Sequence, residues 1–296
     1  MLTHVFSRPQ TPSRVIVLGA GGFLGRRLCQ SLATRRIAAI ALGSRDIDLA
    51  KDTAGEYLRE KLQPADAVVF LSAITPDRGR DSAALVRNLN MARSVCEAAR
   101  GAQISHMIYA SSDAVYPFDY DRITETTPAA PADLYGIMHR TRELVLSSES
   151  QVPLAILRLT AVYGTGDTHN SYGPNRFVRQ ALREGRIALF GNGEETRDHL
   201  YVDDAVALIM QVLLHRSIGV LNLASGHSVS FHEVAEQIGA HAGRAIELQP
   251  SVRQNPVTHR RFDIANLKGA FPDIFLTSLS DGLRKTVVEM RAQTGG

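Results

Sequence analysis

The sequence predicts an α/β protein built on a doubly wound parallel sheet, with a smaller C-terminal lobe. From Arg14 to about residue 165, apolar runs of strand length alternate with helical patterns, which is typical of strands joined by crossover helices. A glycine-rich turn joins the first strand to the first helix. Beyond residue 165 the alternation loosens, and Pro, Gly and charged residues become denser, which indicates a second lobe.

The elements of the sheet can be placed from their periodicity. Apolar runs predict strands, and apolar residues three and four positions apart predict helices. The expected strands are 14–19, 37–42, a very short one at 47–49, 65–73 and 105–112. The expected helices are 26–35, 54–62 and 83–100. Ligands of such a sheet bind at the carboxyl ends of its strands, where the glycines of 19–25 and residues 72–75 and 111–113 fall.

The chain divides into three segments. Residues 1–13, with Pro9 and Pro12, are expected to form a loose tail. Residues 14–165 form the sheet domain, and residues 166–296 form mainly the second lobe, with the chain crossing back to the first domain. Helices are expected in this last segment at 176–185, 203–215 and 230–243.

Composition excludes several classes of protein. The chain has 21% charged and 44% apolar residues, which is ordinary for a soluble globular protein, and its net charge of +3 includes no basic run that would predict a nucleic-acid partner. Gly or charge interrupts the apolar stretches, so no membrane span is expected, and no signal peptide is apparent. We expect a cytoplasmic protein, with Cys29 and Cys96 packed as small hydrophobes.

The glycine turn "GAGGFLG" predicts a dinucleotide site. Gly19, Gly22 and Gly25 follow a strand and open a helix, so the backbone can approach a pyrophosphate at the helix N-terminus. The alternative is an ordinary tight strand-to-helix turn. The strand before and the helix after it favour the dinucleotide.

The spacing G-x-x-G-x-x-G resembles the short-chain dehydrogenase/reductase superfamily, which implies a Rossmann-type fold and an NAD(P) cofactor. In that family an acidic residue closing the second strand selects NAD. Here Ser44 and Arg45 suit a 2′-phosphate, so NADP is favoured over NAD, although Asp46 leaves NAD open. Asp48 and Leu49 resemble the family's acidic and apolar pair beside the adenine.

Two further motifs, "YASSDAVYP" and "LYGIMHRTRE", resemble the extended branch of that superfamily, which modifies nucleotide sugars. The resemblance implies that Ser112 holds the reacting oxygen of the substrate and that Tyr135 is the general acid/base. Asn88 matches a helix asparagine that positions water. Taken singly, Ser112 could be a cap and Tyr135 a core aromatic. The implied cofactor-binding residues are Gly19, Gly22, Phe23, Leu24, Gly25, Ser44, Arg45, Asp48, Leu49, Leu71, Ser72, Ala73, Tyr135 and His139.

His139 stands where the family has a lysine, one helical turn after Tyr135. The lysine binds the nicotinamide ribose and lowers the pKa of the tyrosine with its charge. A neutral imidazole can do the first but does the second poorly, which favours a reductase, in which Tyr135 acts as an acid. Arg142 lies on the same face, two turns after Tyr135. Asp113 is followed by Ala114 in place of the glutamate of sugar dehydratases, so dehydration is not expected.

The second lobe resembles the family's substrate-binding region. Arg197, in "ETRDHLYVDD", matches the arginine that pairs with the diphosphate, and its alternative partners are Asp203 and Asp204. Arg253 lies near the family's second phosphate-binding arginine, with Arg260 and Arg261 as rivals. Ala161 replaces an asparagine that contacts the substrate. The implied substrate-binding residues are Thr75, Asp113, Asn175, Arg197 and Arg253.

The sequence therefore predicts an NAD(P)-dependent 4-epimerase or 4-keto reductase of a nucleotide-diphosphate sugar. The alternative is a non-catalytic or weakly active dinucleotide-binding sensor or scaffold, because His139 replaces the lysine. The resemblance also implies a homodimer formed through two helices of the nucleotide domain. No His-x-x-x-His or His-Glu-x-x-His spacing occurs, so no metal is expected.

Overall fold

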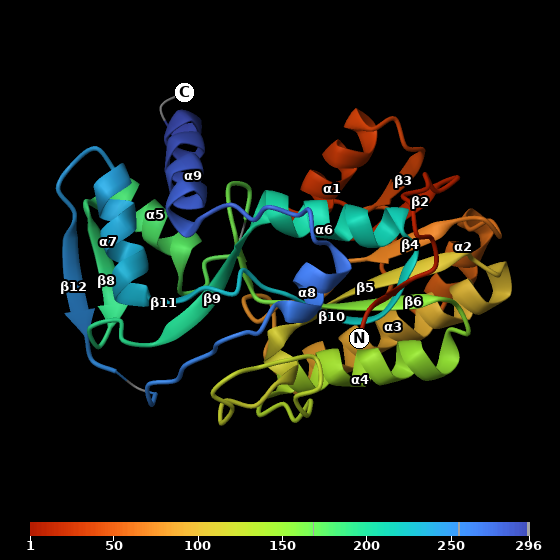
Figure 1. Ribbon diagram of the computed structural model, residues 1–296. Coiled ribbons are helices and arrows are strands. Elements are labelled where there is room, and N and C mark those ends of the chain that lie inside the picture. The colour runs from red at the N-terminus through yellow and green to blue at the C-terminus, as the bar shows by residue number, and fades with distance from the viewer. Residues whose placement is uncertain (168, 254, 295–296) are drawn as a thin grey trace.

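The computed structural model describes residues 1–167, 169–253 and 255–294, and its main sheet has seven strands within that part of the chain (Figure 1). All neighbouring strands are parallel except the edge pair β1 and β10. The prediction of a doubly wound parallel sheet is confirmed. In sheet order the strands are β1 (Thr3–His4), β10 (Ser217–Leu223), β6 (Leu154–Leu159), β5 (His106–Ser112), β4 (Ala67–Phe70), β2 (Val15–Leu18) and β3 (Ala39–Leu42).

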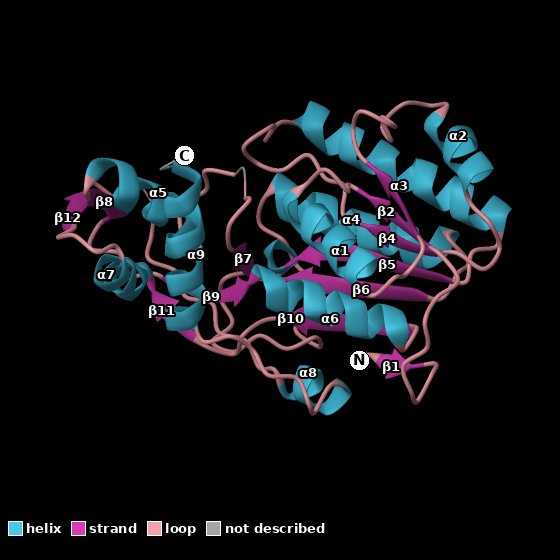
Figure 2. Cartoon of the chain, turned by 90° about the horizontal axis from the view of Figure 1, so that it is seen from above, coloured by secondary structure: helices cyan, strands magenta, loops and turns pink. Residues whose placement is uncertain are grey.

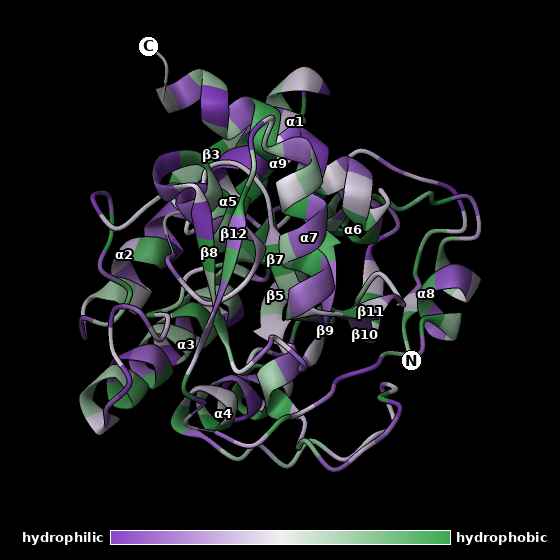
Figure 3. Cartoon of the chain, turned by 90° about the vertical axis from the view of Figure 1, so that its left-hand side faces the viewer, coloured by the Kyte–Doolittle hydropathy of each residue, from purple (hydrophilic) through white to green (hydrophobic). Residues whose placement is uncertain are grey.

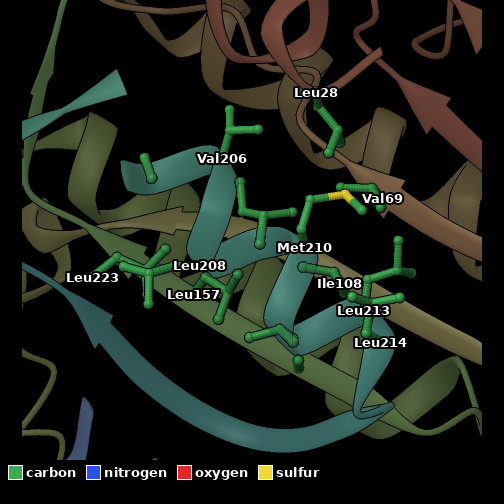
Figure 4. Close-up of a cluster of buried hydrophobic side chains, with 14 of the residues drawn as sticks. Leu28, Val69, Ile108, Leu157, Val206, Leu208, Met210, Leu213, Leu214 and Leu223 are labelled. Atoms are coloured by element: carbon green, nitrogen blue, oxygen red, sulfur yellow. The ribbon is translucent and has the colours of Figure 1, made fainter. Parts of the chain in front are cut away.

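Helices cover both faces of this sheet (Figure 2). On one face lie α1 (Phe23–Thr34) and α6 (Val202–Leu214), and on the other lie α2 (Ala54–Lys61), α3 (Ser82–Ala102) and α4 (Leu134–Glu149). Figure 4 shows the apolar side chains of α6, such as Leu208, lying against Ile108 of β5 and Leu157 of β6. The helix predicted at 203–215 is therefore part of the sheet domain, because almost its entire surface is apolar and needs burial.

The second lobe packs around a smaller apolar core that includes Phe177, Val178, Ile238 and Val287. It contains α5 (Pro174–Glu184), α7 (Phe231–His241), α9 (Leu279–Thr294) and the parallel pair β8 (Arg186–Phe190) and β12 (Glu247–Ser251). Figure 3 shows hydrophobic and hydrophilic residues alternating along surface helices such as α7, as expected for helices with one buried face. A three-stranded sheet of β7 (Ala161–Tyr163), β9 (Thr196–Tyr201) and β11 (Ser228–Ser230) lies between the lobes, and α8 (Ala265–Ala270) packs on β10.

Two local expectations differ from the structure. The first residues are not a loose tail throughout, because β1 extends the sheet and the His4 ring bonds the Ser217 hydroxyl at 2.7 Å and the Ala270 carbonyl oxygen at 2.9 Å. No strand forms at 47–49. There the Asp46 and Asp48 carboxylates accept hydrogen bonds from nearby backbone N–H groups, which compete with strand pairing.

Helix α4 is fastened to the sheet by a buried ion pair between its Glu143 and Arg158 of β6. Two hydrogen bonds, of 2.9 and 2.7 Å, join the guanidinium to the two carboxylate oxygens, and both residues are less than 5% exposed. The Ser111 hydroxyl donates to the same carboxylate at 2.7 Å, and Arg158 also donates to the Tyr116 hydroxyl at 2.8 Å. Since every charge is paired and hydrogen-bonded, the desolvation of the pair is offset.

We predict that Glu143→Ala lowers the free energy of unfolding by about 3–5 kcal/mol, because it leaves the buried Arg158 guanidinium without its anion. Arg140 donates to the same carboxylate from a side chain that is 36% exposed, so Arg140→Ala should cost less than about 1 kcal/mol. Urea unfolding of the two variants measures the difference. Equal losses would show that the buried pair does not hold the helix.

Candidate active site

Ser112 and Tyr135 meet at the carboxyl edge of the sheet. Ser112 ends β5, and its Oγ accepts a hydrogen bond from the N–H of Ala114 at 3.1 Å, which caps the short 3₁₀ helix Asp113–Val115. Tyr135 lies in the first turn of α4, which Asp133 caps by accepting from the N–H of Gly136 at 2.8 Å. A Cβ on Gly136 would lie 2.2 Å from the Ala114 carbonyl oxygen. This close approach brings the tyrosine to the serine.

The environment of Tyr135 keeps its hydroxyl protonated. Burial raises its pKa, and the neighbouring Tyr109 and Asp113 raise it further, because each would add negative charge beside a phenolate. The guanidinium of Arg142 and a hydrogen bond with Ser112 act in the opposite direction but do not cancel the rise. At neutral pH the phenol is therefore suited to donate a proton.

His139 lies against Tyr135 and is uncharged. The two rings meet edge to face, with centroids 4.6 Å apart, and the histidine is 2% exposed. Its Nδ1 lies 2.7 Å from the Tyr109 hydroxyl. Burial, and then the charge of Arg142, lower the pKa of His139 to about 3. The structure thus places no positive charge at this position.

Asn88 lies one helix away from the other three predicted catalytic residues. Its side-chain amide accepts from the N–H of Ile74 at 2.9 Å and donates to the carbonyl oxygens of Ile74 and Ala84. These bonds hold the β4–α3 loop on helix α3. Asn88 therefore acts on the site indirectly, by fixing the backbone of the β4–α3 loop at the sheet edge.

The glycine turn fits a dinucleotide pyrophosphate. A Cβ on Gly25 would lie 2.1 Å from the Gly19 carbonyl oxygen, and Gly19 itself has φ +93°. A Cβ on Gly21 would meet nothing within 4 Å, so the outer side of the turn is open. Gly22 is the N-cap residue of α1, and no side chain makes a capping hydrogen bond there. An anion can thus approach the backbone of this turn closely.

The remaining predicted cofactor residues differ in how exposed they are and in the contacts they make. Ser44 and Arg45 are exposed at the end of β3, and within the described chain the Arg45 side chain makes no hydrogen bond or ion pair. The Asp46 carboxylate turns back to accept from the N–H of Gly43 at 2.8 Å. Asp48 pairs with Arg87 at 3.4 Å. The side chains that pack mainly into the apolar cores are those of Phe23, Leu24, Leu49 and Leu71, whereas Ser72 and Ala73 are half-buried after β4.

A cavity of about 160 Å³ has Asp113, Phe118, Arg197 and Arg260 in its lining. Ser112 and Tyr135 are not in the lining, but Asp113 directly follows Ser112, and Asp133, which also lines the cavity, lies two residues before Tyr135. Arg197 is held there by hydrogen bonds to the Thr258 carbonyl oxygen, at 2.8 Å, and hydroxyl, at 2.7 Å. Its guanidinium and that of Arg260 lie 5.5 and 4.1 Å from the Phe118 ring centroid. Burial raises the pKa of Asp113, and the two arginines oppose that rise. The lining of the cavity combines two arginines with an aromatic ring and with the carboxylates of Asp113 and Asp133.

The other predicted substrate residues lie outside this lining. Arg253 lies outside the lining and forms ion pairs with Glu194 and Glu195. The second arginine of the cavity is Arg260, which pairs with Asp113 at 3.5 Å. Asn175 accepts from the N–H of Gly164 at 3.0 Å and donates to Asp167. Thr75 donates to Asp77 at 2.7 Å in the β4–α3 loop.

A larger hollow, of about 380 Å³, lies between α2 and the loop before it. Asp46, Asp48, Glu56 and Glu60 contribute to its lining, with Lys51 as the one cation there among the described residues. This excess of carboxylates repels phosphate. The arginine-lined cavity therefore suits a diphosphate better.

The family of the chain follows from a match of most of its length. The model of the NAD dependent epimerase/dehydratase family matches residues 15–224, from β2 to just beyond β10. The chain belongs to this family. The resemblance seen in the glycine turn and the tyrosine helix is confirmed.

The proteins and solved structures that the chain is similar to are distant in sequence but span nearly all of it. An uncharacterized UDP-glucose epimerase, YtcB of Bacillus subtilis (strain 168), is 25% identical, over 93% of this chain and 96% of its own length. The UDP-glucose 4-epimerase of Thermus thermophilus in complex with NAD has a TM-score of 0.78 and 23% identity, covering 94% of this chain and 99% of that chain. RMD from Pseudomonas aeruginosa complexed with NADPH has a TM-score of 0.81 and 22% identity, covering 95% and 99%.

Sequence reasoning did not assign three residues to the site. Arg260 was only an alternative to Arg253, because no spacing shows that the chain returns to Asp113. Arg26 donates to the carbonyl oxygens of Gly21 and Gly166, and so joins the glycine turn to the second lobe. Tyr109 reads as an ordinary strand residue until its hydroxyl is placed beside His139.

Within 1–167, 169–253 and 255–294, no group of three or more His, Cys, Asp or Glu side chains is arranged to hold a metal ion. In the same ranges no helix combines the length and the apolar character that crossing a bilayer requires.

We predict that the buried His139 makes the stability of the protein depend on pH. The pKa of His139 is about 3 in the folded state and about 6.5 in the unfolded state. As pH falls below about 6.5, the unfolded chain therefore binds a proton at this residue while the folded chain does not, and the free energy of unfolding decreases. Between about pH 7.5 and about pH 5, wild type should therefore lose about 2 kcal/mol more stability than His139→Gln.

Chemical unfolding at the two pH values measures this difference. His227 is exposed, and His227→Gln is the matched control, which should lose as much stability as wild type. Identical losses in wild type and His139→Gln would contradict a buried neutral imidazole.

Proposed function

We propose that the protein is a nicotinamide-dependent enzyme that reduces a keto group on a nucleotide-diphosphate sugar. The observation that carries the proposal is the contact of Ser112 with Tyr135 at the same sheet edge as the open glycine turn. Their neighbours in the sequence, Asp113 and Asp133, line the cavity that holds two arginines. The bound dinucleotide would supply the hydride. The relatives named as UDP-glucose epimerases and the neighbours that hold NAD or NADPH support the substrate class and the cofactor.

Each residue then has a defined task. Ser112 Oγ would hydrogen-bond the carbonyl oxygen of the substrate, and the Tyr135 hydroxyl would donate its proton to that oxygen as it becomes an alcohol. Arg197 would clamp the diphosphate from the second lobe, with Arg260 beside it. His139 would hydrogen-bond the ribose next to the reacting ring.

The uncharged His139 favours reduction over epimerisation. A 4-epimerase must first remove a proton from the sugar hydroxyl, which needs Tyr135 as a base, and the raised pKa of Tyr135 opposes that role. Reduction uses the protonated phenol. A dinucleotide-binding sensor or scaffold remains the competing outcome, because it would bind the cofactor without turnover.

The predicted homodimer is part of this proposal. Helices α3 and α4 pack side by side and leave Val86, Ile137 and Leu144 exposed, at 55%, 38% and 52%. A second copy would cover these apolar side chains.

Thermal-shift titration of wild type with NADPH, NADH and a panel of nucleoside diphosphates tests the function. A ligand at about 100 times its dissociation constant should add about 2.7 kcal/mol of stability. We predict that Arg197→Met loses the response to the nucleoside diphosphate and keeps the response to the dinucleotide. Tyr135→Phe should keep both responses and lose at least about 100-fold in turnover of a 4-keto nucleotide sugar.

Arg253 is the matched control for Arg197, because its charge is neutralised outside the cavity, so Arg253→Met should respond like wild type. If the protein binds a dinucleotide but no nucleoside diphosphate, and shows no turnover, the result would favour the sensor. A wild type that no dinucleotide stabilises would overturn the proposal.

The choice of cofactor is proposed to rest on Arg45. Its exposed and unpaired guanidinium at the end of β3 suits a 2′-phosphate, whereas Asp46 is engaged with the N–H of Gly43. We predict that Arg45→Ala weakens NADPH binding on the order of tenfold and leaves NADH binding unchanged. Isothermal titration with both cofactors measures it, and a parallel loss for both would contradict recognition of the 2′-phosphate.

A further inference from the structure

Arg142 is a cation sealed inside the protein. It lies on α4 two turns after Tyr135, is 0% exposed, and is the largest of the fully buried side chains in the described chain. Its Nε donates to the Asn88 carbonyl oxygen and its Nη1 to the Ser72 carbonyl oxygen, each at 2.9 Å. The guanidinium carbon lies 4.7 Å from the Phe70 ring centroid and 5.8 Å from that of Tyr109.

No carboxylate neutralises this charge within the described residues. The adjacent acid, Glu143, is bonded to Arg158 and Arg140 instead. A buried cation without an anion is expensive, and most buried charges in proteins are paired. The Nη2 of Arg142 and the Nε2 of His139 are, in addition, buried nitrogens without a hydrogen-bond partner. Such unmet polar groups are expected where a ligand completes the site.

The charge lies directly beneath the cofactor turn. A Cβ on Gly19 would lie 2.9 Å from the backbone N of Ser72, so the glycine turn rests on this residue. The carbonyl oxygen of the same Ser72 accepts from Arg142. One residue of backbone therefore separates the guanidinium from the turn that would hold the dinucleotide.

Tyr109 links the cation to the histidine. The Tyr109 hydroxyl lies 2.7 Å from Nδ1 of His139, and the Arg142 guanidinium lies 5.8 Å from the centroid of the same tyrosine ring. In the tautomer in which this hydroxyl donates to Nδ1, the proton of the imidazole is on Nε2. That Nε2 is buried and has no hydrogen-bond partner in the described chain, so a ribose hydroxyl brought against it by a bound dinucleotide would satisfy it.

We propose that Arg142 is the fixed positive charge of this active site, in place of a charge at residue 139, and that it makes the site prefer the reduced cofactor. The inference rests on the proposed function. An oxidised nicotinamide ring is a cation and is repelled by the guanidinium, whereas a reduced ring is neutral and is not. Arg142 is a positioning residue, since it acts through its field and through Ser72 and touches no reacting atom.

The test compares dissociation constants for the reduced and the oxidised dinucleotide, measured by isothermal titration at neutral pH. Wild type should bind the reduced form more tightly, and Arg142→Met should diminish that preference on the order of tenfold. Arg142→Lys, which keeps the charge, should retain the preference. Arg142→Met/His139→Lys should restore it, because it returns a cation to the site from the next turn of the helix.

ADP-ribose, which lacks the nicotinamide ring, is the control ligand, and its affinity should not follow the charge at residue 142. A merely structural Arg142 would weaken the oxidised and reduced forms alike, and an unchanged ratio in Arg142→Met would overturn the inference. If Arg142→Met does not fold, Arg142→Gln and the double variant answer the same question. A wild type that binds neither form refutes the proposed function instead, so the two failures are distinguishable.

Discussion

The buried ion pair of Glu143 and Arg158 is the constraint on which the site depends. It ties the middle of α4 to β6, and Ser111 binds the same carboxylate from β5. Ser112 follows Ser111 directly, and Tyr135 lies two turns before Glu143 on the helix. The distance between the two chemical groups is therefore set by an interaction that neither of them makes. A rigid element held in this way keeps a reacting pair in register.

The charge distribution around Tyr135 differs from the one that a lysine at residue 139 would produce. The histidine is neutral because burial and a neighbouring guanidinium both oppose its protonation. The positive charge is instead on Arg142, about one turn further along α4 than His139, where the guanidinium donates to the Ser72 carbonyl oxygen. A cation at that position lowers the pKa of Tyr135 without forming an ion pair with it. In this arrangement the Tyr135 hydroxyl can act as a general acid, whereas its raised pKa makes it a poor general base.

Hydrogen bonds made by two polar side chains, those of Asp198 and Arg26, join the two lobes at the site. Asp198 of β9 accepts five hydrogen bonds from segments that follow β6 and β10, including those from Thr160 and from the N–H of Ser225. Arg26 spans from the glycine turn to Gly166. Arg197, next to Asp198 on the same strand, is thereby held at a constant position relative to the sheet edge.

Local pattern was sufficient for much of this protein. Alternating periodicity determined the parallel sheet, the spacing of three glycines determined the turn, and the separation of Tyr135 and His139 placed both on one helical face, because each is a property of neighbouring residues. The tertiary structure decided what depends on distant partners. Residues 3 and 4 of the expected tail pair with β10 as β1. Arg260, and not Arg253, lines the cavity, and Arg142 is buried without an acidic partner among the described residues. Burial and charge pairing join residues far apart in the chain, and no local spacing encodes them.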